Sequence, residues 1–67
     1  MKTTWTLNGV FLTMLHGGWI RGMVWREAGR YRCVSNLGLS DGPKEDHGWP
    51  RQREAMKWCE DAIREQL

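Results

Sequence analysis

The stretch WIRGMVWREAGRYRCV, residues 19–34, decides the fold of this chain, because it reads as two β-strands joined by a tight turn. Gly29 supplies the positive φ of a two-residue hairpin turn, and residues alternate in character on both sides of Ala28-Gly29. This turn places Trp25 opposite Arg32 and Val24 opposite Cys33. A four-residue loop gives the same pairing, so the predicted register does not depend on the turn type.

The predicted hairpin has two different faces, because side chains alternate along a strand. One face is small and apolar and suits a core beneath a helix; it collects Ile20, Gly22, Val24, Tyr31, Cys33 and, at its end, Leu37. The other face alternates tryptophan with arginine; it collects Trp19, Arg21, Met23, Trp25, Arg30, Arg32 and Val34. Arginine stems and guanidinium groups stack on indole rings, which favours cross-strand Trp–Arg contacts on this second face.

The Trp/Arg face has two competing interpretations. Cross-strand pairs can stabilise a small sheet without any ligand. Alternatively, the face binds a partner, because tryptophan and arginine dominate interface hot spots and also suit a nucleic-acid platform. The candidate binding residues are Trp19, Arg21, Trp25, Arg30 and Arg32.

The flanking segments complete an α+β pattern. Residues 3–15 read as strand, interrupted by Asn8-Gly9, which is either a hairpin turn or a bulge; we expect one bent or split strand. Residues 35–48 are rich in Gly, Ser, Asn, Asp and Pro, and predict a long irregular loop. A helix is expected from Pro50 to about Gln66, with an apolar stripe formed by Ala55, Cys59, Ala62 and Ile63.

Composition narrows the function classes. The 67 residues predict a single domain over 1–67, with a formal net charge of +2 that is unevenly distributed. Residues 1–33 carry +4 and residues 34–67 carry −2, which favours an oriented contact with something acidic. No segment is long and apolar enough to span a membrane, and no signal-peptide pattern is present, so we expect a cytoplasmic protein.

The sequence contains no pattern that indicates catalysis, a metal or a cofactor. The histidines and cysteines at positions 16, 33, 47 and 59 include no close pair, whereas structural zinc sites use paired ligands. No arrangement of nucleophile, base and orienting group stands out. We therefore expect no enzyme activity, no metal and no cofactor. Cys33 and Cys59 are expected to be buried, reduced thiols, and a disulfide between strand and helix is the alternative.

Two resemblances follow from this layout of strands and a C-terminal helix. Arg21, Trp25, Arg30 and Arg32 on one sheet face, with Trp49 before the Glu54-Ala55 helix start, resemble the plant ethylene-response-type DNA-binding domain and the arm-binding domain of phage integrases. That resemblance implies a three-stranded sheet lying in the major groove, although the family's fuller strand motifs are absent. In size and architecture alone, the chain is similar to small stand-alone phage and prophage proteins, including anti-CRISPR proteins, which bind and block a host complex.

The sequence therefore predicts an α+β domain with a three- or four-stranded antiparallel meander and one C-terminal helix on one face. The predicted function is non-enzymatic binding of a host protein or ribonucleoprotein complex through the Trp/Arg face. A nucleic-acid-binding module that uses the same face is the alternative, and the protein is expected to be a monomer or a homodimer.

Overall fold

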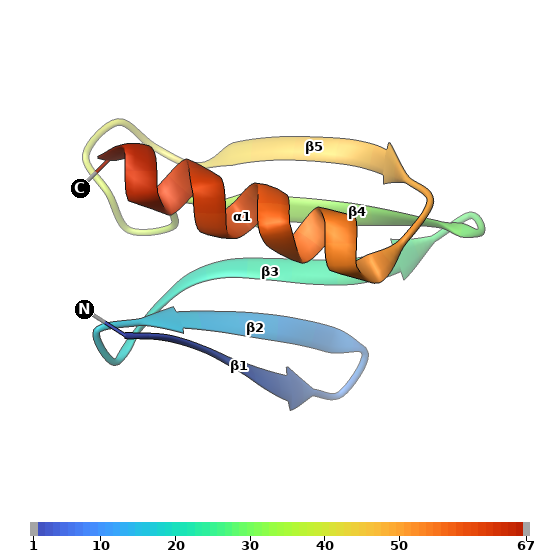
Figure 1. The fold of residues 1–67 in the computed structure, drawn as a ribbon, viewed down its shortest axis with the longest axis horizontal. Helices are drawn as coiled ribbons and strands as arrows, with labels where there is room; N and C mark the ends of the chain where they lie inside the picture. Colours follow the sequence, from blue (N-terminus) through green and yellow to red (C-terminus); the bar gives the residue numbers. More distant parts are fainter. Residues whose placement is uncertain (1, 67) are drawn as a thin grey trace.

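A computed structural model describes residues 2–66, which form one antiparallel sheet and one helix (Figure 1). The sheet has the strand order β1-β2-β3-β4-β5, so each strand pairs with its neighbour in sequence. This confirms the α+β class and the C-terminal helix on one face, but with five strands instead of three or four. The elements are β1 (Thr3–Asn8), β2 (Phe11–His16), β3 (Trp19–Glu27), β4 (Arg30–Ser35), β5 (Lys44–Trp49) and α1 (Gln52–Gln66).

The N-terminal segment is a hairpin, which was the alternative to the one bent or split strand that we expected. Asn8 pairs with Phe11, which leaves Gly9 and Val10 as a two-residue turn. Gly9 has a φ of 65°, a conformation that glycine adopts without steric cost. The turn is thus displaced by one residue from Asn8-Gly9: Asn8 ends β1, and glycine at the first turn position with a negative φ at the second is the pattern of a type II′ turn.

The central hairpin has the register that the sequence predicted. Trp25 pairs with Arg32, Val24 pairs with Cys33, and Glu27 and Arg30 flank the turn. Both turn residues lie in the left-handed region, with φ 52° at Ala28 and 77° at Gly29. Positive φ at both positions is the pattern of a type I′ turn, whose twist matches that of the strands.

The fifth strand lies in the segment that we predicted to be an irregular loop. β5 pairs antiparallel with β4, and only residues 36–43 connect the two strands. The sequence hides this strand because four of its six residues, Lys44 to His47, are charged or histidine and show no apolar alternation. Charged residues suit a strand at the edge of a sheet, where side chains meet solvent.

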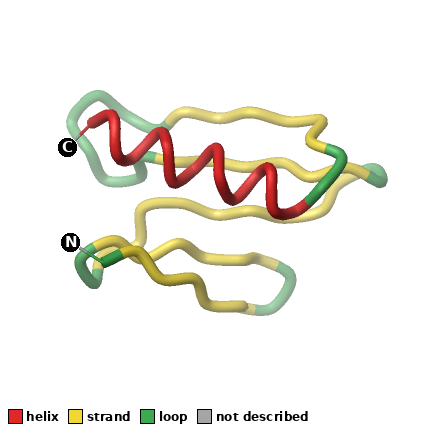
Figure 2. The backbone as a smooth tube through the Cα atoms, in the orientation of Figure 1, coloured by secondary structure: helices red, strands yellow, loops and turns green. Residues whose placement is uncertain are grey.

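The helix begins two residues later than predicted and packs its predicted stripe on the sheet. The Ala55 N–H donates to the Arg51 carbonyl oxygen over 3.3 Å, so Pro50 lies just before the helix. Its buried residues are the four that the sequence indicated: Ala55, Cys59, Ala62 and Ile63. They form the core with Met14, Val24 and Cys33 from three strands. The helix lies over β3, β4 and β5 and leaves β1 and β2 to one side (Figures 1 and 2).

A bulge in β3 overturns part of the predicted face assignment. Met14 pairs with Gly22 and Leu15 pairs with Ile20, so Arg21 is the extra residue. An extra residue shifts the side-chain alternation by one. Ile20, predicted to be in the core, therefore lies on the opposite face beside Leu15 and is 52% exposed. Gly22 stays on the helix side, where an added Cβ would lie 3.0 Å from the Val34 carbonyl oxygen.

The central turn offers a test of this backbone geometry. Replacing Ala28 by Asn should stabilise the protein by about 0.5–1 kcal/mol, because Asn tolerates the left-handed region better than Ala does. Urea unfolding measures the change. Ala28→Val is the matched control and should lose stability, since a β-branched residue is strained at positive φ. Equal stability of all three proteins would contradict the type I′ geometry.

Candidate binding face

The face of the sheet opposite α1 is not covered by any element within residues 2–66, and we call it the open face (Figure 1). The strand register places cross-strand rows of side chains on it. Its central residues come from β2, β3 and β4 and are Phe11, Thr13, Leu15, Ile20, Met23, Trp25, Arg32 and Val34.

An aromatic row forms the centre of the open face. The Phe11 and Trp25 rings lie 5.6 Å apart with an interplanar angle of 63°, an edge-to-face arrangement. Trp25 pairs on its other side with Arg32, so the row runs Phe11, Trp25, Arg32 across three strands. Phe11 is 39% exposed, and the side chain of Trp25 is only half-buried. Aromatic pairs of this geometry are rigid and retain a large apolar area for contact.

The neighbouring rows of the open face are also apolar. Thr13, Met23 and Val34 form one row, and Leu15 and Ile20 form another. Thr13 and Val34 are almost fully buried although no second layer covers them, because the larger side chains around them exclude solvent. The open face is therefore a continuous, tightly packed apolar surface rather than a set of isolated exposed residues.

Opposite charges balance each other at the rim of the open face. Arg32 Nη1 donates to Glu27 Oε2 over 2.8 Å. The hydrogen bond and charge of Glu27, and more weakly the charge of Glu45, raise the pKa of Arg32. Arg30 lies on the same face beside Glu27, and its Nη1 donates to the Gly48 carbonyl oxygen over 3.2 Å. The predicted basic face thus carries two carboxylates, Glu27 and Glu45, beside the two guanidinium groups of Arg30 and Arg32.

Two of the five predicted binding residues, Trp19 and Arg21, lie outside the open face. The bulge at Arg21 brings Trp19 opposite His16, whose Nδ1 lies 2.9 Å from the Thr3 hydroxyl on the helix side of the sheet. Arg21 donates to the Leu37 carbonyl oxygen over 2.8 Å and lies 5.9 Å from the centre of the Trp19 ring. Arg21 is therefore hydrogen-bonded to the turn after β4. The Trp19 ring packs against the Arg21 guanidinium group, and 68% of the Trp19 surface is exposed. Trp25, Arg30 and Arg32 are the predicted residues that share the open face.

The sequence reasoning missed the contribution of β2 to the binding face. Phe11, Thr13 and Leu15 belong to this strand and lie beside β3. A hairpin turn near Asn8-Gly9 would have indicated that β2 pairs with β1, and hence which side chains of β2 lie on each face of the sheet. A second signal was that residues 11–15 are more apolar than one buried face requires. A strand whose alternate side chains lie in the core and on an apolar open face has apolar residues at both sets of positions.

The helix side of the sheet holds a buried polar cluster that has a structural role. The Cys59 thiol donates to the Val34 carbonyl oxygen over 3.3 Å, and the Ser35 hydroxyl lies 3.1 Å from the Cys59 carbonyl oxygen. These contacts tie α1 to β4. Both cysteines are free and fully buried, as expected, and burial is the main cause that raises the pKa of each thiol. Such thiols stay protonated near neutral pH and are poor nucleophiles.

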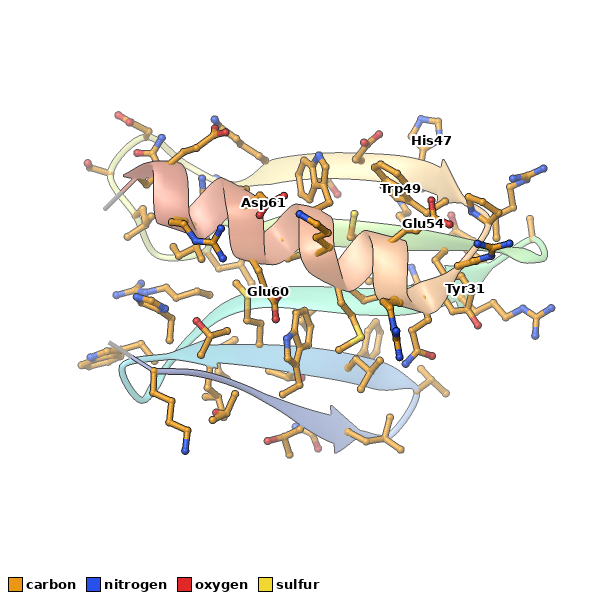
Figure 3. The ribbon with its side chains drawn as sticks, in the orientation of Figure 1. Tyr31, His47, Trp49, Glu54, Glu60 and Asp61 are labelled. Atoms are coloured by element: carbon orange, nitrogen blue, oxygen red, sulfur yellow. The ribbon has the colours of Figure 1, made fainter. Side chains whose placement is uncertain are left out.

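Side chains beside α1 point in two directions (Figure 3). Glu60 points toward β1 and β2, where its Oε2 accepts a hydrogen bond of 2.8 Å from Trp5 Nε1. Trp49 packs against the core beside the first turn of the helix, while His47 points away from the helix beyond β5. Within residues 2–66, no three His, Cys, Asp or Glu side chains gather in a way that could hold a metal ion.

Three comparisons with known proteins found no relative of this chain. No protein-family model, curated protein sequence or solved structure matches the chain. Over residues 2–66, the structure also has no helix that is long and apolar enough to cross a membrane.

The buried thiol of Cys59 predicts a loss of stability in alkali. Its pKa is raised in the folded protein, whereas the unfolded thiol titrates near its ordinary value of 9.0. The unfolded chain therefore loses a proton that the folded protein keeps, and the free energy of unfolding falls as pH rises through this value, by up to about 1.4 kcal/mol per pH unit. Below the ordinary thiol pKa the stabilisation is fully present.

Urea unfolding of the wild type and of Cys59→Ala at a series of pH values tests this expectation. The variant should have lower stability at neutral pH, because it loses the hydrogen bond to Val34, but a shallower decline above about pH 9. Parallel pH profiles would show that Cys59 does not contribute to the decline.

Proposed function

We propose that this protein is a non-enzymatic binding module that docks on a protein partner through its open face. The partner proposed is a host protein or ribonucleoprotein complex, which is the kind of target bound by the phage-type proteins, including anti-CRISPR proteins, that this chain resembles in size and architecture. The observation that carries the proposal is the aromatic row of Phe11, Trp25 and Arg32 on an uncovered, apolar sheet face.

The composition of the open face supports protein binding. Interface hot spots are enriched in Trp and Arg and sit among apolar neighbours that exclude water. Trp25 has this environment, since Phe11, Met23 and Val34 surround it and Arg32 lies at its edge. The packed side chains of the face lose little further conformational entropy on docking, which reduces the cost of association.

The charge balance of the same face distinguishes protein from nucleic acid as the partner. Phosphate binding requires arginines that are free to replace counterions. Arg32 is already engaged by Glu27, and Glu45 lies in the neighbouring row opposite Val34. Nucleic acid is therefore the second candidate, supported by the interleaved aromatic and arginine side chains but opposed by these carboxylates.

A cytoplasmic location is part of the proposal. Cys33 and Cys59 are both free thiols, and they belong to the same buried cluster between the sheet and the helix. A reducing compartment keeps such neighbouring thiols unpaired.

Quantitative capture of partners from a bacterial lysate tests the use of the open face. Phe11→Ala and Arg32→Ala should each reduce the amount of the captured partner by about tenfold or more, because they truncate the central row. Arg53→Ala is the matched control: it removes an exposed side chain from α1, on the opposite side of the sheet, and should leave capture unchanged. Loss of capture in the Arg53 variant, with retention in the other two, would place the binding surface on the helix.

A titration with random duplex and single-stranded DNA separates the two candidate partners. We expect no quenching of tryptophan fluorescence and no gel shift at moderate salt, because the arginines of the open face are balanced by Glu27 and Glu45. Glu27→Gln frees Arg32 and should increase any residual binding at low salt. Micromolar binding by the wild type that collapses with salt would establish the nucleic-acid function instead.

A further inference from the structure

The two edges of the sheet differ in how well they are protected against pairing with another strand. The β5 edge has charged side chains, a register irregularity opposite residues 31–33, and α1 packed beside it. The β1 edge has the sequence TTWTLN, without a charge or proline, and pairs with β2 in an unbroken register. Sheets normally protect their edges with charges, bulges or covering elements, so β1 is the unprotected edge.

The hairpin geometry identifies which backbone groups of β1 are free. In a two-residue hairpin the residues that flank the turn form a hydrogen-bonded pair, and bonded and non-bonded pairs then alternate along the strands. Asn8 and Phe11 flank the turn, so Asn8, Thr6 and Thr4 bond to β2. The Lys2 carbonyl oxygen continues this alternation, since it accepts the Gly17 N–H over 3.2 Å. The N–H and C=O groups of Thr3, Trp5 and Leu7 therefore point outward from the edge.

We infer that β1 pairs antiparallel with β1 of a second copy of this chain, with Trp5 at the twofold axis. This register places Thr3 opposite Leu7 of the second copy and Trp5 opposite its own equivalent. Every outward-pointing group then has a partner, because each of the three pairs exchanges two hydrogen bonds. A twofold interface requires such self-complementarity, and a register centred on Trp5 satisfies all the free groups of Thr3, Trp5 and Leu7.

The side chains match the same register. The sequence Thr4-Trp5-Thr6 is palindromic, so each Thr4 lies opposite Thr6 of the second copy on the open face. Threonine pairs stabilise neighbouring strands, and β-branched residues favour the extended backbone. Lys2 lies opposite Asn8, so no like charges face each other across the axis. Leu7, 68% exposed in one copy, gains a neighbour on the helix side of the joined sheet.

The pairing would join two five-stranded sheets into one continuous sheet of ten strands, with both open faces on the same side. This inference does not depend on the proposed function, because it uses the backbone of β1 and leaves Phe11, Trp25 and Arg32 uncovered. A strand-edge interface is narrow, so the dimer should form and dissociate reversibly with concentration.

Light scattering coupled to gel filtration, together with amide hydrogen exchange, tests the inference on the full chain up to millimolar concentration. The mass should rise toward twice that of the monomer, and the Trp5 and Leu7 amides should become protected as it does so. Thr4 and Thr6 amides bond to β2 within one copy and should be protected at every concentration, which makes them an internal control for folding.

Two substitutions at one site complete the test. Leu7→Pro removes an outward N–H and should weaken dimerisation by roughly tenfold or more, whereas Leu7→Thr keeps the N–H and should dimerise. Phe11→Ala should also dimerise, so failure of this inference is distinguishable from failure of the open-face proposal. A wild type that stays monomeric, unprotected amides at Trp5 and Leu7, or an intact dimer in a folded Leu7→Pro variant would each overturn the inference.

Discussion

The close approach of α1 to β4 is the contact on which the rest of this structure depends. Ala55, Cys59 and Ala62 give the helix a narrow, small-residue side. The Cys59 carbonyl oxygen therefore comes within hydrogen-bonding distance of the Ser35 hydroxyl, and the Cys59 thiol within that of the Val34 carbonyl oxygen. The Cys59 thiol and carbonyl both take part in these bonds, so one residue fixes the position of the helix along the strand. The buried core is consequently thin and is built mainly from Met14, Val24, Cys33 and Ile63.

This placement has a geometric consequence. A helix with its side chains is about 10 Å across, and neighbouring strands are about 4.8 Å apart, so one helix covers only two to three strands of a sheet. Centred near β4, α1 covers β3 to β5, and the Trp5–Glu60 hydrogen bond connects it to β1. The β1 edge and the open face of the sheet are therefore left without a partner in the described chain. Both proposed interaction surfaces exist because the sheet is wider than the one helix can cover.

The open face shows how a small sheet can retain an apolar surface without a second layer. Its side chains shield one another: the Phe11 and Trp25 rings meet edge to face, and Thr13 and Val34 are nearly inaccessible between larger neighbours. The Arg32–Glu27 ion pair at the rim is exposed and stabilises the fold only weakly. Its larger effect is on recognition, because it leaves the face nearly neutral and favours an apolar protein surface over a polyanion as partner.

The sequence alone determined the elements whose signals are local. Alternation around Ala28-Gly29 set the register of the central hairpin, and the spacing of Ala55, Cys59, Ala62 and Ile63 set the buried side of the helix, because strand and helix periods are properties of the backbone. Tertiary structure decided the rest. The bulge at Arg21, which moves Trp19 off the open face and Ile20 onto it, has no sequence signature, since it depends on how β2 and β3 align. The strand in residues 44–49 is likewise not apparent in the sequence, because four of its residues are charged or histidine and only its pairing with β4 makes it a strand of the sheet.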